Sequence, residues 1–142
     1  MRKFEDHDPK TLEEAVECLF LMLSIKERKS LADPDASEGL LSLTDAHNLG
    51  RPLRNAWFHR PIGTVSVLSQ HFRDRFGLGH PDDGSSLIFE GLFAKIKHQR
   101  FDPSVSVERF KSHWKRFGID PLTLEEVDPK WIVPVSFTFI DQ

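Results

Sequence analysis

The sequence predicts a mainly α-helical fold: a compact bundle of five or six helices followed by a short C-terminal β-strand or hairpin. Apolar residues recur with helical spacing through most of the chain, whereas a long alternating stretch occurs at residues 131–139. Five Asp-Pro pairs mark segment boundaries, because proline disfavours helix in the residue before it and is tolerated in a first helical turn. The length of 142 residues, with 39% hydrophobic and 29% charged residues, fits a single globular domain with its own core.

The first helix is expected over residues 12–31, where apolar residues recur at i, i+3, i+4 and i+7. Acidic residues occupy its early turns and basic residues its end, as the helix dipole favours. Thr11 and Glu14 have the spacing of a capping box at its start. Thr123 and Glu126 repeat this spacing, and we expect the same cap chemistry there.

Apolar periodicity, caps and glycine stops predict five further helices. Their expected ranges are 36–47, 52–57, 67–76, 81–98 and 105–117. Gly77 and Gly79 close the third of these helices, and Gly118 ends the last. The apolar side of the last helix is expected to contain Val107, Phe110, Trp114 and Phe117.

Residues 131–139 alternate with a period of two, which is typical of a β-strand. One face carries Trp131, Phe137 and Phe139, and Pro134 favours an edge position. A lone strand is unstable in water, so this strand needs a partner. We expect it to dock on its own domain; the alternatives are the same strand of a second copy and the sheet edge of another protein.

Several function classes find no support in the sequence. The single cysteine, Cys18, excludes an intramolecular disulfide and a cysteine-based zinc cluster. The acidic N-terminus lacks the apolar region of a signal peptide, and the longest apolar stretch is far shorter than the roughly 20 residues that span a bilayer. Phosphate-binding loops, nucleophile elbows, His-Glu-x-x-His motifs and dinucleotide fingerprints are absent from the sequence. We therefore expect a cytoplasmic protein with no cofactor and no membrane contact.

The sequence His-Pro-Asp-Asp-Gly-Ser-Ser, which begins at His80, is the strongest candidate for a site. His80, Asp82 and Asp83 could hold a divalent cation, with His71 as a further ligand, or could supply a base and its orienting partner for hydrolysis. The same residues suit a helix start, with Pro81 at the first position and both aspartates near the positive end of the dipole. We favour the cap interpretation.

Arg54 lies beside Trp57 on a short helix that should face the core. A buried arginine needs a carboxylate partner, because an unpaired buried charge is costly. Our hypothesis is that Arg54 reaches Asp82 or Asp83 and joins two segments of the chain as a structural clamp. The functional alternative is that Arg54 and Asn55 bind an anionic ligand.

Residues 95–116 carry seven basic and two acidic residues, a net charge of +5 in a chain whose formal total is −3. Three of the basic residues, Lys111, Lys115 and Arg116, fall on the last predicted helix among aromatic residues. Phosphate contacts and base stacking on such a surface would suit nucleic acid. The alternative is a solvated helix face that balances the acidic N-terminal region.

Three segments of the chain resemble a small bacterial family that is classed as a domain of unknown function. Residues 9–15 have the pattern P-x-T-x-E-E-A, residues 49–55 the pattern L-G-x-x-[IL]-R-N, and residues 80–85 the pattern H-P-D-D-x-S. The resemblance covers the chain to about Lys97. It implies a mainly helical domain and no known activity.

We therefore expect a helical domain over residues 1–101 and a C-terminal extension, helix plus strand, over residues 102–142 that packs on the same domain. The favoured function is a protein-binding module that acts as an inhibitor, immunity factor or adaptor, with a protein partner or a second copy of the chain. The alternative is a metal-dependent or acid/base hydrolase centred on the segment at His80, and the third is nucleic-acid binding through residues 95–116. An enzyme is the less favoured class.

Overall fold

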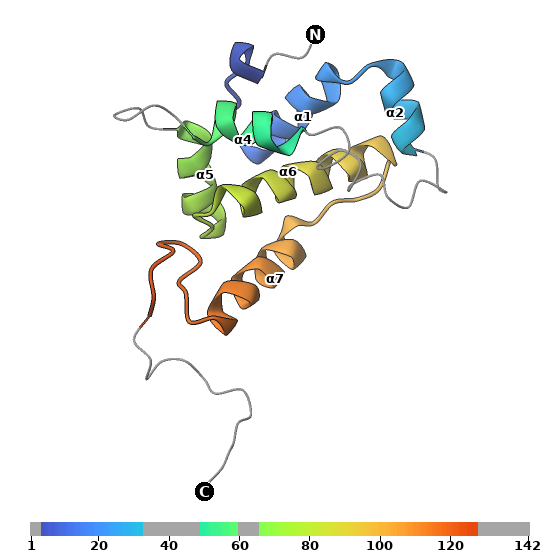
Figure 1. Cartoon of the computed structure of the whole chain (residues 1–142). Helices are drawn as coiled ribbons and strands as arrows, with labels where there is room; N and C mark the ends of the chain where they lie inside the picture. Colours follow the sequence, from blue (N-terminus) through green and yellow to red (C-terminus); the bar gives the residue numbers. More distant parts are fainter. Residues whose placement is uncertain (1–3, 33–48, 60–65, 128–142) are drawn as a thin grey trace, which may run out of the picture.

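The computed structural model of the protein describes residues 4–32, 49–59 and 66–127. These residues form six α-helices and a short 3-10 helix, η1 (Phe4–Asp6), and contain no β-strand. The predicted mainly α-helical bundle is confirmed (Figure 1). The helix expected over residues 36–47 and the strand expected over residues 131–139 lie outside the described residues.

α1 (Leu12–Met22) begins at the predicted cap. The Thr11 hydroxyl accepts a hydrogen bond from the N–H of Glu14 at 3.1 Å, and the Glu14 carboxylate accepts one from the N–H of Lys10 at 2.9 Å. The Thr11 bond is that of a capping box, whereas the Glu14 carboxylate reaches back to the N–H one residue before the N-cap. The predicted start of the first helix is confirmed.

The prediction of one helix over residues 12–31 is wrong, because a second cap divides it. The N–H of Ser24 donates to the Glu27 carboxylate at 2.9 Å, and the N–H of Glu27 donates to the Ser24 hydroxyl at 3.1 Å. This reciprocal pair is a capping box, and it starts a new helix, α2 (Ile25–Ala32).

The remaining helices of the described chain lie within a few residues of their predicted ranges. They are α4 (Gly50–Trp57), α5 (Val67–Phe76), α6 (Pro81–Ile96) and α7 (Pro103–Arg116). α5 ends at Gly77 in the left-handed conformation, as the sequence predicts. A membrane-crossing helix is not found among the described residues.

α6 is the central element of the body. It packs against α1, α2, α4, α5 and α7, and Figure 1 shows it crossing the middle of the molecule with α1 and α4 above it and α7 below. The side chains that it buries completely are Leu87, Ile88, Phe89 and Leu92. A helix that is apolar on several sides is typical of such a surrounded position. Trp57 of α4 is also buried, and its Nε1–H donates to the carbonyl of Phe4 at 3.0 Å, which ties η1 to the core.

α7 packs against α6 with a narrower apolar face than the sequence predicts. Val107 is buried and Phe110 and Trp114 are half-buried, but Phe117 is 64% exposed. The helix ends at Arg116, so Phe117 lies beyond the last turn that reaches α6. The assignment of Phe117 to the apolar face is therefore wrong.

The repeated Thr-x-x-Glu spacing at Thr123 and Glu126 does not start a helix. Instead, one carboxylate oxygen of Asp120 accepts hydrogen bonds from the N–H groups of Leu122, at 2.8 Å, and Thr123, at 3.2 Å. Glu126 pairs with Ile119 in an isolated antiparallel bridge. The predicted second capping box is wrong, because a side-chain-capped turn takes its place.

This turn, residues 120–123, lies directly on the chain between α5 and α6. The N–H of Gly79 donates to the carbonyl of Pro121 at 2.9 Å. The carbonyl oxygen of Leu122 lies only 2.0 Å from the place that a Cβ atom at position 79 would occupy. The close approach is possible only because residue 79 is glycine.

Candidate functional site

The turn before α6 forms the helix cap predicted from the sequence. His80 is the N-cap residue, and its Nδ1 accepts a hydrogen bond from the N–H of Asp82 at 3.0 Å. Pro81 takes the first helical position, where a missing N–H has no consequence. Asp82 and Asp83 lie in the first turn, where the helix dipole stabilises negative charge.

Asp83 joins this turn to α7. Its side chain is buried, and its Oδ2 accepts a hydrogen bond from the indole Nε1–H of Trp114 at 2.7 Å. The His80 ring stacks on the same indole, with 5.2 Å between ring centroids and 25° between the planes. Burial raises the pKa of the Asp83 carboxyl, and the Trp114 hydrogen bond opposes this change. Two side chains at the start of α6 therefore hold one side chain of α7.

Arg54 makes one of the two contacts that our hypothesis allowed. Its Nε lies 3.3 Å from Oδ1 of Asp82, and its Nη1 lies 3.5 Å from the Ser85 hydroxyl. The Ser85 hydroxyl in turn donates to the carbonyl of Asp82 at 3.1 Å. Because the Asp82 side chain is 67% exposed and Arg54 is 29% exposed, water screens this ion pair strongly. The structure contains the contact between Arg54 and Asp82, and its contribution to stability stays a prediction.

The residue that caps the C-terminus of α4, Phe58, also contacts the first turn of α6. A Cβ atom at position 84 would lie 2.6 Å from Cζ of Phe58, so the Phe58 ring packs directly on the backbone of Gly84. Asn55, the other candidate ligand-binding residue on α4, is exposed.

The fold does not bring His71 together with His80, Asp82 and Asp83 to form the alternative metal site. Nε2 of His71 accepts a hydrogen bond from the N–H of Leu12 at 3.0 Å, so His71 caps α1 instead of joining His80, Asp82 and Asp83. Burial lowers the pKa of His71, followed by the effect of the nearby Arg75 cation, which fits a neutral ring that accepts this bond. In the described part of the chain, no group of three or more His, Cys, Asp or Glu side chains is arranged to hold a metal ion.

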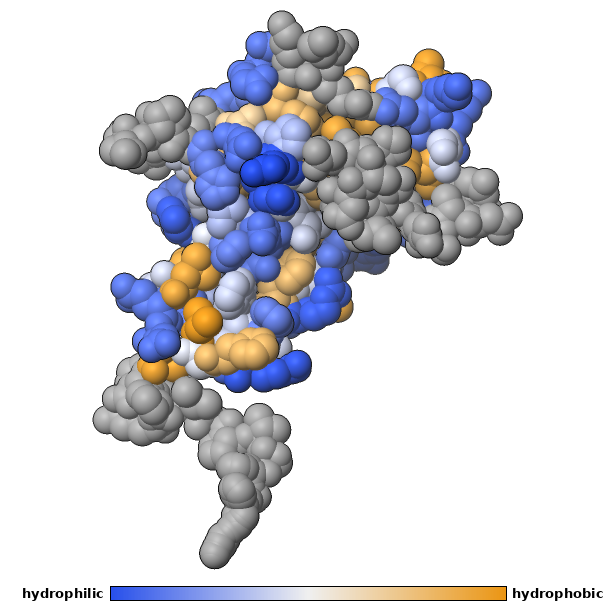
Figure 2. Space-filling model, in the orientation of Figure 1, coloured by the Kyte–Doolittle hydropathy of each residue, from blue (hydrophilic) through white to orange (hydrophobic). Residues whose placement is uncertain are grey.

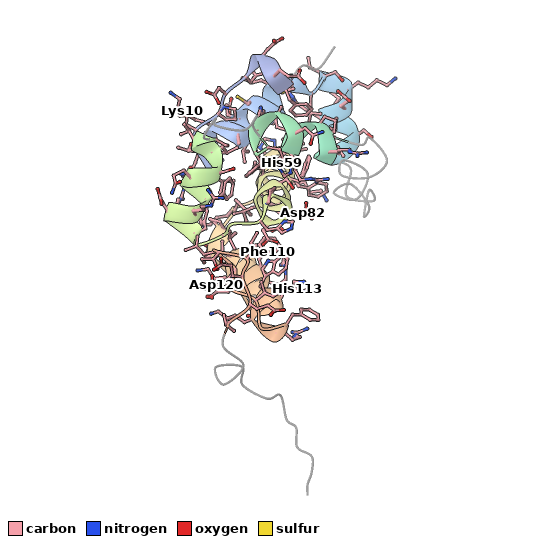
Figure 3. The ribbon with its side chains drawn as sticks, turned by 60° about the vertical axis from the view of Figure 1, so that its left-hand side comes forward. Lys10, His59, Asp82, Phe110, His113 and Asp120 are labelled. Carbon is pink, nitrogen blue, oxygen red and sulfur yellow. The ribbon has the colours of Figure 1, made fainter. Side chains whose placement is uncertain are left out.

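The acid/base groups of the turn are likewise engaged in structural bonds. Nδ1 of His80 and the Asp83 carboxylate both accept hydrogen bonds from the protein itself. Figure 3 shows Asp82 where α6 meets α7, with Phe110 and His113 on α7 below it. The hydrolase alternative needs a base with a free lone pair beside a substrate, which this arrangement does not offer at His80 Nδ1.

The basic residues of 95–116 are partly neutralised. Lys95 pairs with Glu17 at 2.9 Å, and Arg109 pairs with Glu90 at 2.8 Å. The Nζ of Lys97 lies 4.4 Å from the centroid of the Phe93 ring. The two ion pairs reduce the field that a nucleic-acid backbone would meet, whereas Lys97 keeps its full charge beside the neutral Phe93 ring.

The three basic residues that we singled out on α7 have different surroundings. Lys111 is half-buried, with its Nζ 3.2 Å from the Cβ position at Gly77, whereas Lys115 and Arg116 are exposed in the last turn. The interleaved aromatic rings do not lie free for base stacking: Trp114 is covered by His80, and Phe101 and Phe110 pack partly buried against the core.

The end of α7 and the segment after it expose an unexpected group of side chains. Phe117, Leu122 and Leu124 are exposed apolar residues, and the His113 ring stands edge-on to Phe117 with 5.2 Å between centroids. Figure 2 shows apolar residues, in orange, over the segment after α7 in the lower part of the view. The name C-terminal surface is used from here on for six residues: His113, Lys115, Arg116, Phe117, Leu122 and Leu124.

The larger part of the chain matches a known protein family. Residues 8–96 match a domain of unknown function, DUF6794. The chain belongs to the DUF6794 family. The family membership predicted from the sequence is thereby confirmed, and neither a curated protein nor a solved structure matches the chain.

The DUF6794 match contains the cap of α1, the Arg54 helix and the whole of α6, and it ends at Ile96, the last residue of α6. α7 and the C-terminal surface come after the matched region. The hydrogen bond from Trp114 to Asp83 therefore joins a residue outside the DUF6794 match to a residue inside it.

Proposed function

We propose that this protein is a protein-binding module, acting as an inhibitor, immunity factor or adaptor, and that the C-terminal surface makes the contact. The observation that carries the proposal is the exposure of Phe117 beside two cations, Lys115 and Arg116, at the end of a fixed helix. Aromatic residues and arginine are enriched among the residues that dominate binding energy at protein interfaces.

The attachment of α7 to α6 supports this proposal. Trp114 is held by the Asp83 hydrogen bond and by the stacked His80 ring, one turn before the exposed Phe117. A surface that is already ordered loses less conformational entropy when it binds, so its contacts contribute more to affinity. The predicted strand with Trp131, Phe137 and Phe139 lies outside the described residues, and its pairing with a sheet edge of the partner is the alternative to docking on its own domain.

The same contacts make the two other functions weaker candidates. A hydrolase centred on His80, Asp82 and Asp83 would have to release Nδ1 of His80 from the cap of α6 and the Asp83 carboxylate from Trp114 of α7. A nucleic-acid surface would lose two of its cations, Lys95 and Arg109, to ion pairs with Glu17 and Glu90. Neither alternative gains an observation of its own from the described residues.

The test compares two full-length variants, Phe117→Ser and Leu21→Ser. Both residues are 64% exposed, so each variant removes an equally exposed apolar side chain, one on the C-terminal surface and one on α1. Proteins of the native host that bind the wild type are captured and purified, and their dissociation constants are measured by calorimetry. Light scattering over a range of concentrations measures self-association in parallel.

We expect Phe117→Ser to weaken either direct binding or self-association by at least about tenfold, since truncating a residue that dominates an interface costs about 2 kcal/mol or more, and about 1.4 kcal/mol is tenfold in affinity. Leu21→Ser should bind like the wild type. A partner that binds both variants equally contradicts the proposal. So does a chain that stays monomeric and captures nothing that binds it again after purification.

A further inference from the structure

A second region carries chemistry that the proposed function does not use. A hollow of about 240 Å³ lies between α2 and the end of α6, and Arg28, Lys29, Lys95, His98 and the Phe20 ring contribute to its lining. None of the described residues that line it is acidic. Figure 1 shows α2 at the opposite end of the body from the segment after α7, so this hollow is separate from the C-terminal surface.

Two of the cations that line the hollow, Arg28 and Lys95, lie beside one aromatic ring. The Nε of Arg28 donates to the carbonyl of Phe20 at 2.9 Å, and its guanidinium carbon lies 4.1 Å from the Phe20 ring centroid. The Nζ of Lys95 lies 4.9 Å from the same centroid and 2.9 Å from the Glu17 carboxylate. After this ion pair, the positive charges of Arg28 and Lys29 still face the hollow, and none of its described lining residues carries a carboxylate.

His98 occupies a position that favours glycine. α6 ends in a Schellman motif, in which the N–H of Gln99 donates to the carbonyl of Ala94 at 2.8 Å and the N–H of His98 donates to the carbonyl of Lys95 at 3.2 Å. His98 has the left-handed conformation, with a φ of 55°, which glycine adopts without strain and a residue with a Cβ atom does not. The strained backbone places an imidazole in the lining of the hollow.

The end of α6 does not itself need these cations. Backbone N–H groups already bond to three of its last carbonyls: Lys97 to Phe93, His98 to Lys95, and Gln99 to Ala94. Cations near a helix C-terminus often satisfy such carbonyls, but here the Schellman motif does so. Among the described residues, Arg28 and Lys29 therefore have no carboxylate in the lining of the hollow, and their charges can meet an external anion.

We propose that this hollow binds a compact phosphate dianion, either inorganic phosphate or the phosphate group of a small monoester. Its volume is below the range of about 300–1,000 Å³ that is typical of sites for drug-sized ligands, which favours a small anion. The planar guanidinium of Arg28 can donate two parallel hydrogen bonds to phosphate oxygens, and Lys29 adds a second charge. This inference is independent of the proposed protein-binding function.

The test titrates the full chain with inorganic phosphate and, separately, with glycerol 3-phosphate, at constant ionic strength set with sodium chloride. Binding is measured by calorimetry, and the midpoint of thermal unfolding is measured alongside it, because a ligand that binds only the folded state raises its stability. The variants are Lys29→Gln and His98→Gly. Lys26→Gln is the matched control, since Lys26 is an exposed lysine of the same helix that does not line the hollow.

We expect phosphate to bind the wild type and Lys26→Gln equally, and to bind Lys29→Gln at least tenfold more weakly. His98→Gly should raise the unfolding temperature of the ligand-free protein, because it relieves the left-handed strain, and should weaken phosphate binding. A purely structural His98 would not produce these opposite effects. Tighter binding of the monoester than of phosphate identifies an organic phosphate as the ligand, and the reverse order identifies the inorganic ion.

Three results would overturn the proposal. The first is the absence of phosphate binding to the wild type. The second is an equal loss of binding in Lys29→Gln and Lys26→Gln, which would indicate unspecific attraction to a basic helix. The third is unchanged phosphate affinity in His98→Gly.

Discussion

Residues 8–14 and residues 120–126 share the pattern Asp-Pro-x-Thr-Leu-Glu-Glu, but they adopt different structures. In the first segment the Thr11 hydroxyl caps the N–H of Glu14, and α1 begins there. In the second segment a carboxylate oxygen of Asp120 takes two N–H groups, and the chain forms a turn without a helix. The same local signal therefore does not decide the local structure.

The difference lies in the burial of the residues after each threonine. Leu12 is 3% exposed and opens a helix that buries further apolar residues against α6, whereas Leu124 is 37% exposed with a φ of 65°. Val127, Asp128 and Pro129 come after the second segment, and proline disfavours helix in the residue before it. A short helix is marginal in water without a buried face, so a capping box starts a helix only where the next turns carry such a face.

The largest contrast is expected for truncation of the two leucines. Leu12→Ala should lower the free energy of unfolding by about 2–5 kcal/mol, because it leaves a cavity in the core. Leu124→Ala should change it by less than about 0.5 kcal/mol, as is usual for surface positions. Denaturation with urea measures both values, and similar losses in the two variants would show that the second segment is more tightly packed than its exposure indicates.

The second segment follows α7, so a substitution that loosens α7 from α6 should affect this segment and leave the first one unchanged. Asp83→Ala leaves the indole N–H of Trp114 without its acceptor, which should cost about 1–3 kcal/mol, whereas Asp83→Asn keeps an acceptor and should cost less. Hydrogen exchange should accelerate across α7 and the turn 120–123 in Asp83→Ala, while α1 keeps its protection. Equal acceleration in both regions would argue against a local role for this bond.

The two threonines offer the next contrast. Thr11→Ala should lower the stability by about 1 kcal/mol, the usual effect of losing an N-cap side chain. Thr123→Ala should stay within about 0.5 kcal/mol, because the neighbouring turn is capped by Asp120 and no helix depends on it. Thermal unfolding of both variants at one pH compares them directly. A larger loss for Thr123→Ala would reverse our ranking of the two caps.

A glycine substitution should have opposite signs in the two segments. Leu124→Gly relieves a left-handed conformation that costs about 1–2 kcal/mol in residues with a Cβ atom, while glycine adds freedom to the unfolded chain. The net effect should be a gain of less than about 1 kcal/mol. Leu12→Gly should destabilise strongly, because it removes a buried side chain from a helix. Urea denaturation tests the pair, and a loss of stability in Leu124→Gly contradicts the strain argument.

The smallest effect concerns pH and the first segment only. Burial and the Arg75 cation lower the pKa of His71 below its ordinary value, so the unfolded chain binds a proton more readily than the folded one. Stability should therefore fall as the pH drops below about 6.5, the ordinary histidine value. His71→Gln, which keeps an acceptor for the Leu12 N–H, should lose this part of the pH dependence. The test measures the free energy of unfolding of the wild type and of His71→Gln from about one pH unit above this value to about one below it. An identical dependence of this free energy on pH in the two proteins would contradict the assignment to His71.

Most helix boundaries of the described chain could be predicted because their signals are local. Thr11, Gly77 and the His80-Pro81 pair each act within one or two turns of the backbone. The capping box of Ser24 and Glu27 is also local, but the apolar run that precedes it continues to Ile25 and hides the break between α1 and α2. A search for every Ser-x-x-Glu spacing would have found it.

The candidate site was predictable only in part. The contact between Arg54 and Asp82 could be inferred from the need of a charged side chain for a partner. The bond between Trp114 and Asp83 joins residues 31 positions apart. It depends on how α7 packs on α6, and no local sequence pattern encodes that packing. Nearness in the sequence was also misleading for His71, because α5 carries it toward Leu12 instead of toward His80.

The contact between Gly79 and the Leu122 carbonyl has a consequence for evolution. A methyl group at position 79 would collide with the backbone of a segment that lies beyond the DUF6794 match. The choice of residue inside the shared domain is thus constrained by an appendage outside it. We expect any relative that keeps this turn against the chain between α5 and α6 to keep a glycine at the equivalent of Gly79, so this single position predicts which relatives share the arrangement.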